Sequence, residues 1–129
     1  MRFWKIFIYG LIMASMLLLT GCGGAQGMLD SIEGAKVGVS MPTQSLQRWN
    51  QDGANLEERL RGMDLDVDVE FADYDTKKQI SHIDHMIDRG CKVIIIGAVD
   101  GNALSSVLSK AKDAGAAVIA YDRLIMNTD

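Results

Sequence analysis

The sequence predicts an α/β fold in which helices cover both faces of a doubly wound parallel sheet. Segments with strand patterns alternate with segments with helix patterns in the order β-α-β-α-β-α-β, which is typical of parallel sheets. One strand candidate contains the uninterrupted apolar run at residues 93–96, as expected for a strand that is buried on both faces. A glycine follows each helical segment, at Gly62, Gly90 and Gly115, where it can end the helix. Because crossovers between parallel strands are right-handed, these patterns restrict the topology to a doubly wound sheet.

The first three elements are predicted over residues 37–40, 44–61 and 65–72. Residues 37–40 form a short apolar strand. The helix that follows has its apolar positions at Leu46, Trp49, Leu56 and Leu60. The second strand alternates, with Leu65, Val67, Val69 and Phe71 on one face and Asp66, Asp68 and Glu70 on the other. This half-polar strand is therefore predicted at an edge of the sheet.

The remaining elements are predicted over residues 76–89, 91–97, 102–114 and 116–121. The first of these is a helix with apolar residues at spacings of three and four, namely Ile80, Ile83, Met86 and Ile87. The next is the strand that contains the apolar run, and its composition predicts a central position. A third helix and a fourth strand complete the pattern.

The composition indicates one globular domain that does not bind nucleic acid. The chain has 129 residues, of which 48% are apolar and 23% are charged, as in ordinary globular proteins. Thirteen basic and 17 acidic residues give a net charge of −4, without the basic stripe that nucleic-acid binders carry. Cys22 and Cys91 are too few for a disulfide scaffold or a cysteine-rich zinc site.

The acidic motif Asp64-x-Asp66-x-Asp68 resembles the start of a calcium-binding loop. Such a loop needs a glycine at its sixth position and a glutamate at its twelfth. Val69 and Asp75 occupy these positions here. The motif therefore favours a solvated strand face.

Other motifs for metals, cofactors and covalent catalysis are incomplete as well. His82 and His85 are three residues apart on a predicted helix, but a metal site needs a third ligand. No phosphate-binding glycine loop follows residues 37–40, so a nucleotide is not expected. Cys91, at the entry to the most apolar strand, is expected to be a buried, unreactive thiol. We therefore expect neither a metal nor a cofactor.

The N-terminus has the features of a lipoprotein signal peptide. Arg2 and Lys5 precede an uncharged run at residues 6–19, which is too short to cross a membrane comfortably. The segment Leu19-Thr20-Gly21-Cys22 that follows resembles a bacterial lipobox, and a buried helix with a chance cysteine is the simpler alternative. The sequence thus predicts a signal peptide at 1–21, a flexible tether at 22–35 and a folded domain at 36–129. Acyl chains such as palmitate on Cys22 would anchor the protein to the bilayer on the extracytoplasmic side, at the cell surface or in the periplasm.

The candidate binding residues lie where strands are predicted to end. Ligands of open α/β sheets bind beyond the carboxyl ends of the strands. Arg48, Trp49, Asp122 and Arg123 all fall at that edge. An aromatic face can cover the C–H patches of a sugar, while an aspartate accepts from hydroxyls and an arginine donates to them. The alternative is that Trp49 packs in the core and the charged residues form a structural ion network.

Two short segments are distinctive, Arg48-Trp49 and Tyr121-Asp122-Arg123. Together with residues 37–43, 79–87 and 90–96, they make the region 36–129 resemble the N-terminal part of periplasmic sugar-binding proteins of bacterial ABC transporters. The xylose and multiple-sugar (glucose/galactose) binders are the most similar subgroup. The resemblance implies an incomplete N-terminal lobe of a type I periplasmic binding protein. It also implies that Arg48, Asp122 and Arg123 bond sugar hydroxyls and that nearby aromatic residues, Trp49 among them, stack on the sugar.

The function that this resemblance implies is monosaccharide binding without chemistry on the sugar. We expect a monomeric lipoprotein that binds an aldopentose or aldohexose and delivers it to an ABC-transporter permease. A sugar-sensing subunit that presents the sugar to a membrane receptor kinase is an alternative. A small anchored α/β enzyme is another, although no nucleophile–base pair is recognisable. The family continues into a second lobe, whereas this sequence stops at Asp129, so a fragment or a non-functional truncated remnant with weak affinity is also expected.

Overall fold

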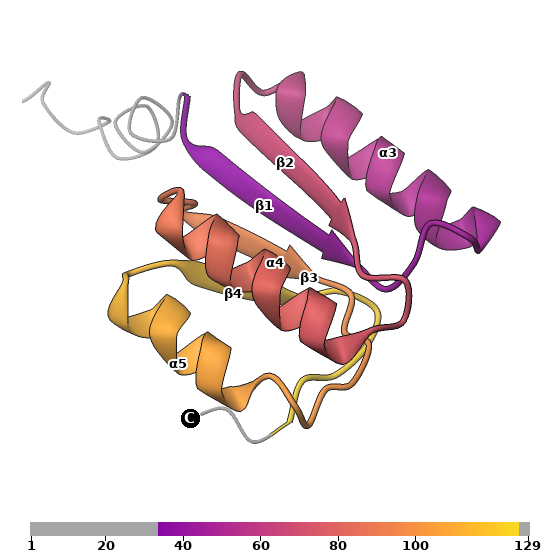
Figure 1. Ribbon diagram of the computed structural model, residues 1–129. Coiled ribbons are helices and arrows are strands. Elements are labelled where there is room, and N and C mark those ends of the chain that lie inside the picture. Colours follow the sequence, from indigo (N-terminus) through magenta and orange to yellow (C-terminus); the bar gives the residue numbers. More distant parts are fainter. Residues whose placement is uncertain (1–33, 127–129) are drawn as a thin grey trace, which may run out of the picture. The chain divides into compact units, whose positions relative to one another are not determined.

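The computed structural model describes residues 34–126, which form a parallel sheet with three helices (Figure 1). The strands are β1 (Lys36–Met41), β2 (Asp66–Phe71), β3 (Val93–Ile96) and β4 (Ala117–Ala120). The helices are α3 (Gln47–Arg61), α4 (Thr76–Asp88) and α5 (Ser105–Asp113). The strand order is β2-β1-β3-β4 and every neighbouring pair is parallel. The predicted fold class is therefore confirmed, with the half-polar β2 at an edge and the apolar β3 inside the sheet.

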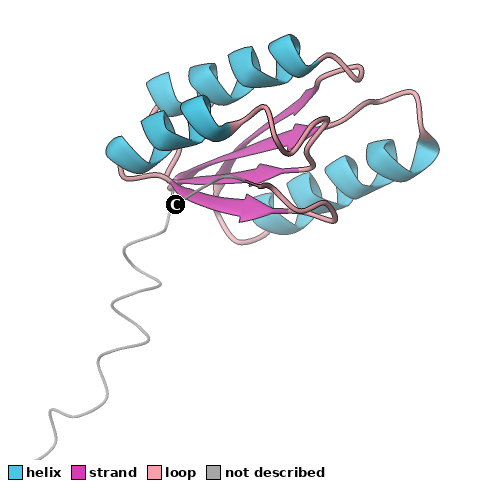
Figure 2. Ribbon diagram, turned by 90° about the horizontal axis from the view of Figure 1, so that it is seen from below, coloured by secondary structure: helices cyan, strands magenta, loops and turns pink. Residues whose placement is uncertain are grey.

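The helices form a layer on each side of the sheet, with α3 on one face and α4 and α5 on the other (Figure 2). Successive residues of a strand point to opposite faces, so a strand that is covered on both sides, as β3 is, contributes to two cores. The core beneath α3 contains Val37, Val39, Met41, Trp49, Val67 and Ile95. The core beneath α4 and α5 is built around Ile83, Met86, Ile94, Ile96 and Leu104. The uninterrupted apolar run of β3 thus reflects burial on both faces, as the sequence predicts.

Helix α4 packs closely against β1, and Gly38 makes this contact possible. A Cβ atom at position 38 would lie 2.5 Å from Sδ of Met86. Real Cβ atoms do not approach that closely, so with any other residue at position 38 the buried side chain of Met86 would have to move. The glycine in this strand therefore marks a close approach of two elements.

Two helices start later than the sequence predicts, at Gln47 and Ser105. Before α3, Thr43 Oγ1 accepts a hydrogen bond of 3.1 Å from the amide of Ser45. Before α5, Asp100 Oδ1 accepts one of 2.9 Å from the amide of Asn102. Such side-chain hydrogen bonds stabilise turns in place of the first helical turn. The periodicity of apolar residues extends into these segments, but their local polar residues decide the conformation.

The acidic face of β2 is not simply solvated, which corrects the interpretation of the Asp64–Asp68 motif. Asp68 accepts a hydrogen bond from Arg89, at the end of α4. Glu70 Oε2 lies 3.1 Å from Nε2 of His82, which is buried on the same helix. The acidic face therefore packs against α4 through charged and polar pairs.

The remaining expectations fall partly outside the described residues. The predicted signal peptide and the lipidation site Cys22 lie there, so both stay predictions. Within residues 34–126, no helix combines the length and the apolar character that crossing a bilayer requires. The same residues contain no group of three or more histidine, cysteine or acidic side chains placed to hold a metal. Cys91 is buried as expected, and burial raises the pKa of its thiol.

Candidate functional site

The carboxyl ends of the parallel strands meet at one end of the sheet, as the arrowheads in Figure 1 show. We call this end the rim and define it as residues 42–49 together with residues 72–75, 97–104 and 121–126. The rim segments are tied to one another by backbone hydrogen bonds. Tyr74 donates to Pro42 O at 2.8 Å, and Met126 donates to Gly101 O at 3.0 Å. A Cβ atom on Gly101 would lie 2.3 Å from the carbonyl oxygen of Leu124, so these two segments approach each other closely.

All four predicted site residues lie at this rim, and the structure brings them together. Arg48, in the first turn of α3, donates from Nη2 to Oδ1 of Asp122, which follows β4. Arg48 Nε also lies 3.7 Å from Oδ2 of Asp52. The hydrogen bond with Asp122 raises the pKa of Arg48. Since the Arg48 side chain is 60% exposed and that of Asp122 is 32% exposed, a ligand can reach both groups.

Trp49 lies beneath the two arginines rather than at the surface. Its residue exposure is 3%, and it belongs to the core under α3. The guanidinium carbons of Arg48 and Arg123 lie over its ring, 4.8 Å and 5.3 Å from the centroid. Both distances are within the range of attractive cation–π contacts. Trp49 is thus a core residue that also supports two cations, and the stacking of a sugar on it stays a prediction that requires an arginine to move.

Arg123 is held by the neighbouring rim segment as well as by Trp49. Its Nη1 atom donates a hydrogen bond of 3.0 Å to the carbonyl oxygen of Ala98. Ala98 itself is 1% exposed, so this acceptor belongs to a packed part of the rim. The guanidinium is therefore fixed from two sides while it carries further N–H donors.

The backbone around Asp122 adopts an uncommon conformation. Its φ is +62°, and the amide of Arg123 donates a hydrogen bond of 2.7 Å to the carbonyl oxygen of Tyr121. A positive φ with a bond between residues i and i+2 indicates a strained γ-turn. Asp73 and Tyr74, also at the rim, have φ values of +54° and +59°. Strained backbone gathers at functional sites more often than elsewhere, which favours the rim as a binding surface.

Three residues at the rim or beside it, Asp52, Tyr121 and Gln79, were given no individual role by the sequence reasoning. Burial is the main cause that raises the pKa of Tyr121, and the charge of Asp52 and its hydrogen bond add to the effect. Gln79 has no exposed surface, and its amide bonds to Ser40, Gly97 and Val99. The available signal for Gln79 was a polar residue at a position where the apolar face of its helix continues.

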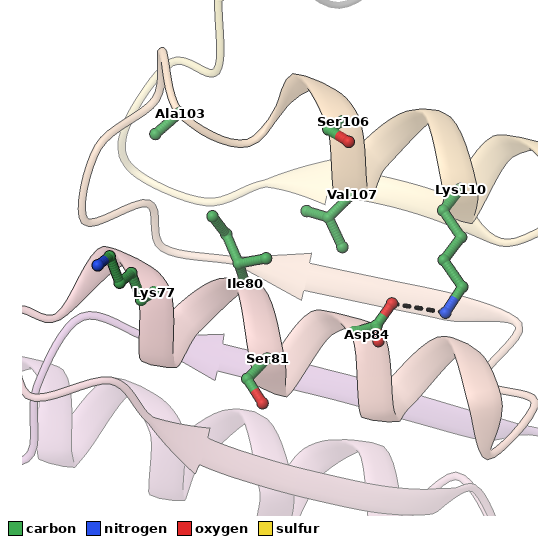
Figure 3. Close-up of a pocket in the computed structure, with 8 residues that line it drawn as sticks. All are labelled: Lys77, Ile80, Ser81, Asp84, Ala103, Ser106, Val107 and Lys110. Atoms are coloured by element: carbon green, nitrogen blue, oxygen red, sulfur yellow. Dashed lines mark hydrogen bonds and ion pairs between the residues drawn. The ribbon is translucent and has the colours of Figure 1, made fainter.

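A concave feature lies away from the predicted residues. It is a groove of about 420 Å³ between α4 and α5, drawn in Figure 3. Ile80 and Val107 lie at its apolar floor, and Lys110 reaches from α5 to Asp84 on α4 at 2.5 Å. None of the four predicted site residues lines this groove. The rim, not the groove, is therefore the candidate site.

Comparison with known proteins gives consistent matches. The periplasmic binding protein domain family matches residues 37–129. The multiple sugar-binding periplasmic receptor ChvE of Rhizobium radiobacter is 46% identical over 92 residues, which cover 71% of this chain and 26% of that protein. A D-xylose-binding periplasmic protein of Haemophilus influenzae is 39% identical over 94 residues, which cover 73% of this chain and 28% of that protein.

A solved structure shows the same arrangement of the backbone. An ABC transporter solute binding protein from Clostridium phytofermentans, with bound β-D-glucose, has a TM-score of 0.72 and is 51% identical. The match covers 73% of this chain and 29% of that chain. This chain spans about a quarter to a third of the length of the curated relatives that it matches.

Proposed function

This chain belongs to the periplasmic binding protein domain family, and we propose that its rim is one half of a binding site for a monosaccharide. One observation carries the proposal. Arg48 and Arg123 come from segments far apart in the sequence, yet both lie over Trp49 at the carboxyl ends of the strands, and Asp122 pairs with Arg48 there. Such a place is where open α/β sheets bind ligands.

The chemistry of these groups suits the hydroxyl groups of a sugar. Asp122 can accept hydrogen bonds, and each guanidinium presents five N–H donors in a fixed plane. Charge-assisted hydrogen bonds are about twice as strong as neutral ones, so these residues can compete with water for hydroxyls. Because Ala98 and Trp49 already orient Arg123, little conformational freedom is lost when a ligand binds.

The relatives support an aldose as the ligand. The names of the similar proteins refer to multiple sugars and to D-xylose, and one similar structure contains β-D-glucose. An aldopentose or aldohexose in its ring form presents several hydroxyls to one planar set of donors. We therefore propose an aldose of this size for this chain.

We further propose that the protein is a lipoprotein that delivers its sugar to an ABC-transporter permease. The lipobox-like segment before Cys22 supports the anchor, and the name of the similar Clostridium protein supports the transport role. A lipid anchor would keep a sugar receptor close to its permease. One similar protein is described as a receptor, which favours sugar sensing through a membrane receptor kinase as a second candidate.

An NMR titration tests the binding role. The ¹⁵N-labelled full chain in detergent is titrated with D-glucose, D-xylose and, as a non-sugar control, glycerol. We expect the indole N–H of Trp49 and the amides of residues 121–123 to shift with either sugar and not with glycerol. The substitution Arg123→Ala is expected to weaken binding by about 10–100-fold, the loss of one or two charge-assisted bonds.

A matched substitution provides the control for this titration. Arg59→Ala removes an exposed arginine from the other end of α3 and should leave the titration unchanged. If neither sugar shifts the rim resonances of the wild-type chain, the proposed function is wrong. Equal affinities for wild type and Arg123→Ala would overturn the assignment of the site.

A further inference from the structure

We infer that Gln79 is a positioning residue that holds Arg123 in its binding conformation through the rim segment at residues 97–99. The inference rests on the proposed function, because it assigns a role toward the same ligand. Gln79 lies in the first turns of α4, and its side chain is fully buried. It contacts neither Arg123 nor the exposed surface, so its effect on a ligand must pass through other residues.

The side-chain amide of Gln79 is bonded at both of its polar atoms. Nε2 donates to the carbonyl oxygen of Gly97 at 2.9 Å and to Oγ of Ser40 at 3.2 Å. Oε1 accepts from the amide of Val99 at 2.8 Å. The amide thus fastens the residues on both sides of Ala98 to helix α4 and, through Ser40, to the end of β1.

Ala98 connects the hydrogen bonds of Gln79 to the candidate site. Its two neighbours are held by Gln79, and its own carbonyl oxygen accepts the hydrogen bond of 3.0 Å from Arg123 Nη1. The position of that oxygen decides where the guanidinium lies over Trp49, 5.3 Å from the ring centroid. A rim segment released by Gln79 would let Arg123 leave this position.

Glutamine suits this place because it offers a donor and an acceptor in one neutral group. A methionine has similar length but makes none of the three bonds. A charged glutamate can accept from Val99 but cannot donate to Gly97 or Ser40, whereas a protonated carboxyl group has both an O–H donor and a C=O acceptor. A buried carboxyl group is protonated at higher pH than an exposed one. In Gln79→Glu the side chain can therefore make both donor and acceptor hydrogen bonds when it is protonated, and it loses the donor bonds when it is ionised.

The test compares Gln79→Met and Gln79→Glu with wild type in the full chain, with Trp4→Phe in every protein. This background leaves Trp49 as the single tryptophan of the sequence. Ile83→Val serves as the matched control, because Ile83 is a fully buried residue of the same helix that packs in the core. Two quantities are measured: the affinity for D-glucose by NMR titration, and the emission of Trp49, which responds to the charge over its ring.

We expect Gln79→Met to weaken glucose binding by about tenfold and to change the Trp49 emission, while Ile83→Val alters neither. Gln79→Glu should resemble Gln79→Met at about pH 8 and approach wild type at about pH 5. The neighbouring elements also carry ionisable residues, namely His82 on α4, Glu70 on β2, and Asp75 and Lys78 at the start of α4. Each affinity is therefore divided by that of wild type at the same pH.

Each outcome decides the inference. If wild type binds glucose and Gln79→Met binds equally well, Gln79 is only a structural residue and the proposed function stands. If wild type binds no sugar, the proposed function fails, and an unchanged Trp49 emission in Gln79→Met overturns the inference as well. Should Gln79→Met fail to fold, Gln79→Glu decides: recovery of affinity and emission at low pH supports the inference, and a flat pH profile overturns it.

Discussion

Arg48 and Asp122 form an ion pair at the rim although 74 residues separate them in the sequence. The pair joins the start of α3 to the segment that follows β4, so it links the helix on one face of the sheet to the end of an edge strand. Both side chains are exposed enough to contact a ligand, and the strained turn at Asp122 fixes one of them. Exposed ion pairs contribute little to stability, so this pair is better explained by binding than by folding.

The first prediction separates these two roles. Arg48→Ala and Asp122→Asn should each weaken sugar binding by about tenfold or more, because each removes a charge-assisted partner of the hydroxyls. Neither change should move the urea midpoint of unfolding much, since the pair is exposed. Parallel titrations and urea curves check this, and a large loss of stability with unchanged affinity would assign the pair to the fold.

A second prediction concerns the close contact between β1 and α4. Gly38→Ala places a Cβ atom 2.5 Å from Sδ of Met86, so we expect a loss of about 1–3 kcal/mol in the free energy of unfolding. Met86→Ala alone leaves a cavity in the core and should cost about 2–5 kcal/mol. The double variant should lose less than the sum of the two single changes, because the new methyl group occupies space that Met86 leaves. Urea unfolding of the two single variants and the double variant measures the coupling. Additive effects would show that the steric contact is not the cause.

The pH dependence of stability gives a third prediction. Burial, with the charge of Asp52, raises the pKa of Tyr121 above its value in the unfolded chain. A raised folded-state pKa means that the stabilisation is complete below about pH 10, the unfolded pKa, and is lost as pH rises through the folded value. Tyr121→Phe should therefore lose less stability than wild type between about pH 9 and about pH 11. Tyr74→Phe, at an exposed tyrosine of the rim, is the control and should behave as wild type.

The sheet was predictable because the pattern of apolar and polar residues in each strand reflects what packs against its two faces. The uninterrupted apolar run in β3 reflects burial in an apolar core on both faces. The alternation in β2 reflects one apolar face beneath α3 and one acidic face that pairs with α4. The starts of α3 and α5 were less predictable. There, Thr43 and Asp100 bond to nearby amides and override an apolar periodicity that continues through both segments.

The candidate site divides in the same way. Arg48, Asp122 and Arg123 could be placed together because parallel strands end at one edge. The burial of Trp49 could not be predicted, since a core residue and a ligand-stacking residue have the same sequence pattern. For Gln79 the sequence offered only a polar residue on the apolar face of its helix. Its partners come from β1 and from the segment after β3, so only the three-dimensional packing shows which groups its amide bonds.

The last prediction concerns the attachment of the protein to the membrane. If Cys22 is acylated, Cys22→Ser should abolish incorporation of labelled palmitate and release the protein from the membrane fraction. The physical reason is that each buried methylene of an acyl chain contributes about 0.8 kcal/mol, so that several chains together hold a protein at the bilayer. Cys91→Ser is the matched control, because Cys91 is the other cysteine of the sequence and lies buried beside β3. Labelling of Cys22→Ser at the wild-type level would show that the segment before Cys22 is not a lipobox, and the anchor would then have to be abandoned while the sugar-binding proposal stands.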